Sequence, residues 1–171
     1  MNLENRRAQA LIAALALIVV ASTAYVLTSR GEQQALATRQ AEIAAKSRQV
    51  MPFDLERTTH QFAKAATGGV QTVTSDDPAD AQQVRLIREH LTAEAAGFSR
   101  GDYGDPASIH GGEMPGLREL EQGHSRIDIR YTELPAGARI AYTTADAALV
   151  KALHAWFDAQ VTDHGRHAEH G

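Results

Sequence analysis

A chain of 171 residues with a formal net charge of −4 at neutral pH has room for one modest domain and an additional terminal segment. The acidic balance, without any Lys/Arg cluster, excludes the basic face that nucleic-acid binding requires, and we expect no nucleic-acid partner. The absence of Cys excludes disulfides, thiolate metal sites and cysteine nucleophiles. All eight His fall between His60 and His170, so imidazole is the nitrogen donor to consider.

An apolar run without a charged side chain covers residues 10–27. As a helix it is about 27 Å long, close to the thickness of the hydrocarbon layer of a membrane. Two interpretations stay open, an uncleaved anchor and a signal peptide cleaved near residues 22–24. We favour the anchor, because apolar character continues to Leu27, beyond that cleavage site. The prediction is a cytoplasmic tail over residues 1–9 and a transmembrane anchor over residues 10–28.

The residues on both sides of the run predict its orientation. Arg6 and Arg7 directly precede it, and positive residues favour the cytoplasmic side. We therefore expect a single-pass protein of the inner membrane whose C-terminal domain is extracytoplasmic, which in a bacterium means periplasmic. Residues 29–51 are rich in Ala, Gln, Glu, Arg and Lys and predict a helical stalk. Pro52 ends the stalk, because the residue before a proline disfavours the helical conformation.

The remainder, residues 52–165, predicts one α+β domain in which each half has the order strand, turn, strand, helix. Paired, the two halves would form a four-stranded antiparallel sheet with two helices on one face. Gly69 and Gly137 occupy matching places, so we interpret the domain as a duplicated ββα unit; two similar units of independent origin are the alternative. The expected strands are residues 58–64, 69–74, 126–132 and 139–143, and the expected helices are residues 78–98 and 146–163.

Both expected helices carry an apolar stripe at helical spacing, and these stripes predict the core. In the first helix the stripe consists of Val84, Ile87, Leu91, Ala95 and Phe98. In the second helix it consists of Val150, Leu153, Phe157 and Val161. Residues 166–171, which follow the second helix, predict a flexible His-containing tail.

Between the two halves, residues 101–117 are punctuated by Gly, Asp and Pro and predict an ordered loop. The loop carries His110 and Met114, which are four residues apart. Imidazole and thioether donors suit copper, whereas imidazole together with carboxylate suits zinc. We therefore predict a binding site for a copper or zinc ion, or for a metal-containing ligand, at His110 and Met114, with His90 and His124 as further donors.

Two other functions stay open beside metal binding. One is a small hydrolase-like enzyme in which His110 works with a loop carboxylate. The loop carboxylates are Asp102, Asp105 and Glu113. The other is a structural subunit of a membrane complex. His90 and Glu94 are four residues apart on the first helix, and we interpret them as an ordinary surface pair.

Five segments of the chain carry a family resemblance: MPFDLERTTHQF, GGVQTV, QVRLIREHL, IHGGEMPGL and AWFDAQVTDHG. They resemble a group of small bacterial membrane-anchored proteins, some of which have the inherited name aspartate carbamoyltransferase, and the resemblance covers about residues 51–165. The residues do not support that activity. Catalytic transcarbamoylase chains have a Ser-Thr-Arg-Thr phosphate loop, whose nearest fragment here, residues 28–30, flanks the apolar run. Their zinc-binding regulatory chains need four Cys, and this chain has none.

Overall fold

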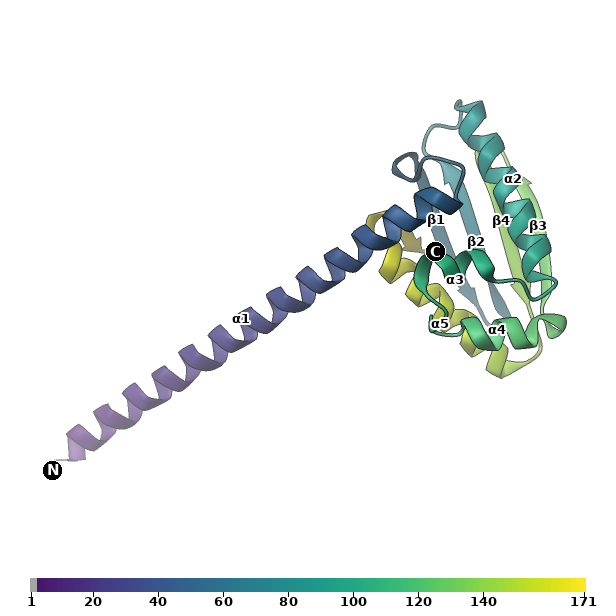
Figure 1. The fold of residues 1–171 in the computed structure, drawn as a ribbon. Coiled ribbons are helices and arrows are strands. Elements are labelled where there is room, and N and C mark those ends of the chain that lie inside the picture. Colours follow the sequence, from purple (N-terminus) through teal and green to yellow (C-terminus); the bar gives the residue numbers. More distant parts are fainter. Residues whose placement is uncertain (1–2) are drawn as a thin grey trace. The chain divides into compact units, whose positions relative to one another are not determined.

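The computed structural model describes the backbone of residues 3–171, together with the side chains of Leu17 and of residues 20–171. The chain divides into two units, Met1–Arg39 and a compact unit, Gln40–Gly171. Five α-helices and one five-stranded mixed sheet make up the regular structure of the described residues (Figure 1). The α+β class expected from the sequence is therefore confirmed.

Helix α1 spans Leu3–Val50. The predicted cytoplasmic tail and about half of the predicted anchor fall on residues whose side chains lie outside the described part of the structure. Where side chains are described, none of the helices combines the length and the apolar character needed to cross a membrane. The anchor over residues 10–28 therefore stays a prediction.

The last turns of α1 belong to the compact unit. Ile43 and Ser47 are buried, and the Gln40 Nε2–H group donates a hydrogen bond to the Thr162 carbonyl at 2.8 Å. The predicted stalk is helical as far as Val50, and its last part is packed against the rest of the compact unit. The compact unit begins at Gln40, ahead of the predicted boundary.

The sheet has the order β3-β4-β2-β1-β5. Its strands are β1 (Thr58–Ala65), β2 (Gly68–Ser75), β3 (Asp128–Leu134), β4 (Gly137–Thr143) and β5 (Ala168–His170). Strands β1 to β4 pair antiparallel, as predicted, whereas β5 adds parallel to β1 and makes the sheet mixed. The predicted flexible tail thus supplies β5, because the edge of β1 offers unpaired backbone groups, including the Phe62 carbonyl that accepts from the Gly171 N–H group.

Two glycines bring the neighbouring strands β2 and β4 together. Gly68 has φ +148°, and a Cβ there would lie 1.8 Å from the Tyr142 carbonyl oxygen. A Cβ at Gly137 would lie 2.1 Å from the Val73 carbonyl oxygen. Gly68 is the first residue of β2, and Gly137 is the first residue of β4. Because the two strands pair antiparallel, each glycine lies against the backbone at the end of the other strand. The structural counterpart of Gly137 is therefore Gly68, and not Gly69 as the sequence comparison suggested.

Helices α2 (Ala81–Phe98) and α5 (Ala147–His164) pack on the same face of the sheet. The rings of Phe98 on α2 and Trp156 on α5 have centroids 5.9 Å apart, and both rings contact Tyr142 of β4. The predicted stripe of α2 is buried throughout. In α5 the buried positions are Leu149, Ala152, Leu153, Trp156, Phe157, Gln160, Asp163 and His164. Leu153 and Phe157 are thus confirmed as core, whereas Val150 and Val161 are only half-buried.

The stretch expected to be a loop contains a short helix. Helix α3 spans Gly104–His110 and α4 follows at Leu117–Gly123. The helix forms because Pro106 lies in its first turn, where a missing N–H group costs nothing. The Asp102 carboxylate accepts a hydrogen bond from the Gly104 N–H group at 3.0 Å just before it. As a result, Asp105 and His110 are held on a helix that faces α2 and α5.

Candidate metal site

A cavity of about 30 Å³ lies between the sheet and helices α2, α3 and α5. This volume holds roughly two water molecules. Although most of the surrounding core is apolar, the cavity is rich in groups that bind protons or metals. Its ionisable lining consists of His60, His90, Glu94, Asp105, His110 and His164.

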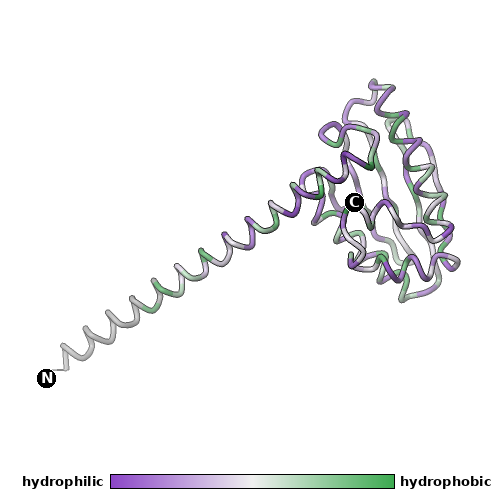
Figure 2. Tube along the Cα trace, viewed as in Figure 1, coloured by the Kyte–Doolittle hydropathy of each residue, from purple (hydrophilic) through white to green (hydrophobic). Residues whose placement is uncertain are grey.

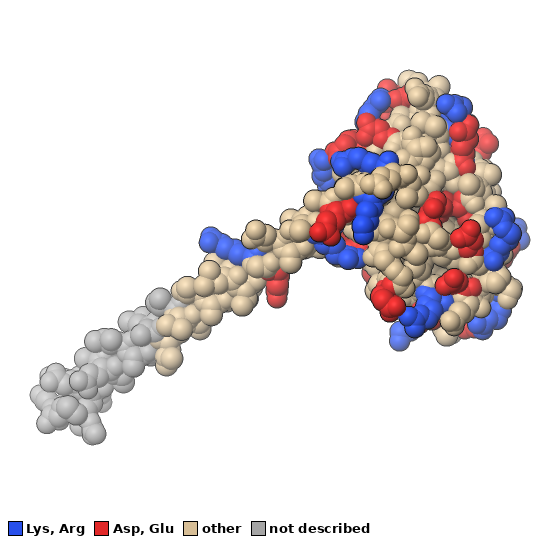
Figure 3. All heavy atoms as spheres, in the orientation of Figure 1, with Lys and Arg blue, Asp and Glu red and all other residues tan. Residues whose placement is uncertain are grey.

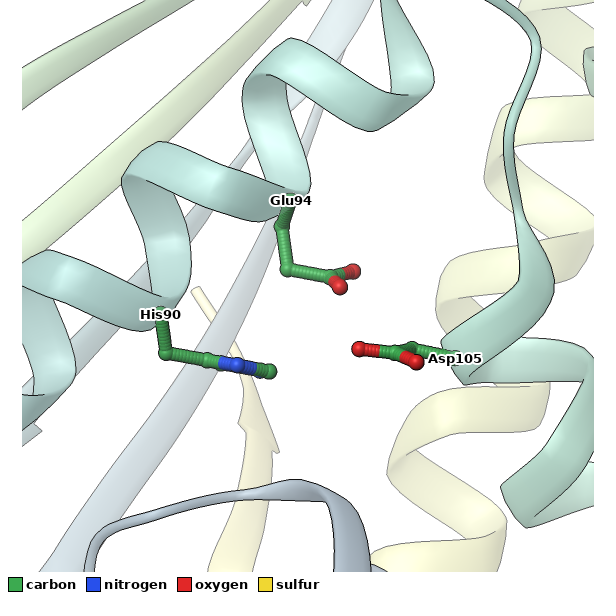
Figure 4. Close-up of side chains that lie close together, drawn as sticks. All are labelled: His90, Glu94 and Asp105. Carbon is green, nitrogen blue, oxygen red and sulfur yellow. The ribbon is translucent and has the colours of Figure 1, made fainter.

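Three of these side chains converge at the mouth of the cavity. His90 and Glu94 lie one turn apart on α2, and Asp105 lies in the first turn of α3. Each offers one ligand atom, and the three ligand atoms all lie within 4.8 Å of one another. Figure 4 shows the three side chains pointing toward one another across the gap between the two helices. The arrangement offers one imidazole nitrogen and two carboxylate oxygens to a single ion.

The Glu94 carboxyl group of this cluster stands in an unfavourable environment for negative charge. Burial, followed by a hydrogen bond with Asp105 and the charge of Asp105, raises the pKa of Glu94 to about 9. Burial lowers the pKa of His90, against the opposing charge of Asp105. Basic and acidic side chains intermingle on the visible face of the compact unit (Figure 3), but the described cavity lining contains no Lys or Arg. Nothing in that lining compensates a second negative charge.

Behind the cluster, three imidazole rings contact one another in the core. His60 of β1 stacks on His164 of α5 with ring centroids 5.6 Å apart, and His110 meets His164 edge to face at 4.9 Å. His110 Nδ1 lies 2.8 Å from Asp163 Oδ2, and both side chains are almost fully buried. Burial lowers the pKa of His60 to about 4, and burial also lowers the pKa of His164 well below its usual value. These two rings are therefore neutral at pH 7.

Two buried nitrogen atoms in the cavity lining have no hydrogen-bond partner among the described residues, His60 Nδ1 and Trp156 Nε1. The His167 backbone acts against burial and raises the pKa of His60, but burial is the larger effect. The Trp156 indole N–H group is a hydrogen-bond donor. Buried polar groups without partners are rare in folded proteins.

The structure brings together two of the four predicted metal ligands. His90 and His110 both line the cavity. Met114 is instead buried in the apolar core, and the described cavity lining does not include it. His124 is absent from that lining too: its ring lies against Gly101, and its Nδ1 bonds to the Glu121 carbonyl. The nitrogen-and-sulfur arrangement expected for copper is therefore not what the described residues present.

The predicted partner of His110 also changes. The sequence suggested a carboxylate of its own loop, whereas the structure places Asp163 of α5 against its Nδ1. Asp105 belongs with His90 and Glu94, whose four-residue spacing looked like a surface pair. Asp163 and Trp156 were not singled out from the sequence. An acidic residue within the last turn of a predicted amphipathic helix is the only signal that pointed to Asp163.

Neither the protein-family models, nor the curated proteins, nor the solved structures give a match to the chain. The resemblance suggested by the five sequence segments therefore stays a prediction. The functional interpretation rests on the geometry of the cavity and its lining.

Proposed function

We propose that the compact unit binds a divalent metal ion, with zinc as the preferred ion, through His90, Glu94 and Asp105. The observation that carries the proposal is the convergence of their three ligand atoms within 4.8 Å, from two helices that the fold holds in place. Three protein donors and one open position, filled by water, are typical of zinc sites that exchange ligands.

The charges of the cluster support a cation at this position. Burial and the neighbouring Asp105 disfavour the ionisation of Glu94, and a divalent ion offsets that penalty by supplying two positive charges. Ligand oxygens must be deprotonated to coordinate a metal, so binding releases a proton from Glu94. The donor set of one nitrogen and two oxygens favours zinc over copper(I), which prefers thioether and thiolate sulfur.

A titration of the purified full chain with zinc against a chromophoric chelator tests this function. We expect one site that binds in the low-micromolar range or tighter, because three donors are held in one place. Each of the substitutions His90→Ala, Glu94→Gln and Asp105→Asn should weaken binding by about tenfold or more. His124→Ala removes an imidazole outside the cavity and is the matched control.

Two outcomes would contradict the proposal. One is the absence of zinc binding in the wild-type protein. The other is equal affinity in the wild type and in all three ligand variants, which would assign the binding to other His residues. Copper(I), titrated in parallel with wild type and Met114→Leu, tests the sulfur-dependent site predicted from the sequence.

We also propose that residues 10–28 attach the compact unit to the inner membrane and that the unit is extracytoplasmic. Large apolar side chains in the described part of this segment support attachment, because they are solvent-exposed in the isolated chain: Leu17 is 71% exposed and Tyr25 is 74% exposed. The apolar turns are visible in Figure 2. A lipid environment would cover them. Protease treatment of spheroplasts should digest the compact unit, and a protected unit would contradict this orientation.

A further inference from the structure

The chain that leaves α1 contacts the metal cluster before it enters β1. Met51 lines the cavity, and Phe53, which is 4% exposed, lies against a proposed metal ligand. The rings of Phe53 and His90 meet edge to face, with centroids 5.6 Å apart and an interplanar angle of 70°. The ring centroid of His60 lies 5.9 Å from that of Phe53. One buried aromatic side chain therefore contacts both a proposed ligand on α2 and an imidazole on β1.

Among the described residues, the His90 ring has this aromatic contact but no hydrogen bond. A histidine that binds a metal through one ring nitrogen usually donates a hydrogen bond from the other, and that bond fixes the direction of the ring. Without a fixed neighbour, an imidazole turns about its side-chain torsions among several rotamers. Packing against Phe53 restricts the ring to the direction in which it points toward Glu94 and Asp105 (Figure 4).

The position of Phe53 is in turn fixed by a side chain of α2. The N–H group of Asp54, the next residue, donates a hydrogen bond to Gln83 Oε1 at 3.0 Å, and Gln83 Nε2–H donates one to the Asp54 carbonyl at 3.1 Å. Gln83 is 5% exposed, so little solvent competes for these bonds. An amide side chain can make this pair of bonds because it carries both a donor and an acceptor, whereas a carboxylate has no donor.

We propose that Phe53 is a positioning residue for the metal ligand His90 and that Gln83 holds Phe53 in place through the Asp54 backbone. Gln83 and His90 lie on the same face of α2, because their separation of seven residues makes almost two turns. The chain next to Phe53 is thus tied to the helix that carries the ligand. This inference rests on the proposed metal function: an ion meets a nitrogen donor that is already oriented, which raises its affinity.

The test measures two properties of the full chain. Zinc affinity comes from chelator competition, and the coordination geometry is monitored by the visible absorption spectrum of the cobalt(II)-loaded protein. Phe53→Leu keeps an apolar side chain at the buried position and removes the ring. We expect it to weaken zinc binding by about tenfold, the usual effect of losing a group that orients a ligand. The cobalt(II) bands should change, because the imidazole is no longer held in one direction.

Phe157→Leu is the matched control. Phe157 is 0% exposed, and its ring contacts other aromatic rings of the core rather than a proposed ligand. The same substitution there removes a ring from the core and lowers the free energy of unfolding without changing the neighbours of His90. Zinc affinity should stay within about threefold of the wild type, and the cobalt(II) spectrum should not change. The comparison separates the positioning of a ligand from a general loss of packing.

Two further measurements test the route by which Phe53 acts. Gln83→Glu keeps the size of the side chain but removes the donor to the Asp54 carbonyl, so it should weaken zinc binding several-fold. Gln82→Glu adds the same charge at the exposed neighbouring position and should not weaken it. In a His90→Ala background, Phe53→Leu should have no further effect on zinc affinity, because Phe53 acts through that ring.

Unchanged zinc affinity and an unchanged cobalt(II) spectrum in Phe53→Leu would overturn the inference and leave the metal function standing. Equal losses in Phe53→Leu and Phe157→Leu would do the same, as would a loss that persists in the His90→Ala background, since neither depends on the orientation of His90. Equal affinities in Gln83→Glu and Gln82→Glu would overturn the role of Gln83. Absence of zinc binding in the wild type would overturn the inference together with the function on which it rests.

Discussion

Lowering the pH should destabilise the wild-type protein more than it destabilises His60→Phe. Burial lowers the pKa of His60 to about 4, whereas an unfolded chain leaves it near 6.5. Between these two values the unfolded state binds more protons than the folded state. The contribution of His60 to stability is therefore fully present above pH 6.5 and is lost as the pH falls toward 4.

The size of the effect follows from the shift. Since one pKa unit corresponds to about 1.4 kcal/mol, the shift of His60 amounts to about 3 kcal/mol when titration is complete. About 2 kcal/mol of it falls between pH 7 and pH 4.5. His164, which stacks on His60 and whose pKa burial also lowers, acts in the same sense.

Glu94 acts in the opposite sense and must be separated from this effect. Burial raises its pKa to about 9, so the folded state gains stability relative to the unfolded state as the pH falls from 9 toward 4.5. The pH profile of the wild type is the sum of these contributions. The prediction therefore concerns the difference between two proteins that share Glu94 and His164 and differ only at position 60.

Urea unfolding of the metal-free full chain measures this difference, with the fluorescence of the single Trp, the buried Trp156, as the signal. The unfolding free energy of His60→Phe should rise relative to that of the wild type by about 2 kcal/mol between pH 7 and pH 4.5. The exposed His170, replaced in His170→Gln, is the control for removing an imidazole. A constant difference between wild type and His60→Phe across this range would refute the reasoning from burial.

Three further substitutions, at two positions, test the packing. Leu153→Ala should destabilise the compact unit by about 2–5 kcal/mol, because Leu153 is 1% exposed in the core, and a loss below about 0.5 kcal/mol in urea unfolding would place it at the surface. Asp163→Ala should cost about 3–5 kcal/mol, because it removes the carboxylate against buried His110 Nδ1. Asp163→Asn should cost clearly less, because its amide oxygen still accepts that bond; equal losses in thermal unfolding would contradict this role.

The sequence predicted the elements of the compact unit better than their contacts. Alternating and helical periodicities located the strands β1 to β4 and the helices α2 and α5, because these patterns depend on neighbours along the chain. Strand β5 was missed, because it has only three residues, two of them polar, and joins the sheet only through the free edge of β1. Helix α3 was missed because Gly, Asp and Pro indicate a turn when they are considered one by one.

For the site, the sequence named the ligand types but not the partners. His90 and Glu94 were recognisable as a pair at helical spacing, and Asp105 as a loop carboxylate. Only the packing of α3 against α2 brings the three ligand atoms within 4.8 Å. For Met114 the sequence interpretation does not match the structure. Its spacing from His110 suggested that both bind one ion, but its apolar side chain is buried in the core.

The cavity gathers several features that each oppose folding stability. Glu94 is protonated far above its usual pKa, and two buried nitrogen atoms, His60 Nδ1 and Trp156 Nε1, lack partners among the described residues. Apolar residues of similar size would fill such positions at lower free energy. Sequences tend to violate local rules where a site requires it. A subunit that served only as a spacer or packing surface would have no need for these groups in one cavity, which favours a bound ion and its ligand over a purely structural role.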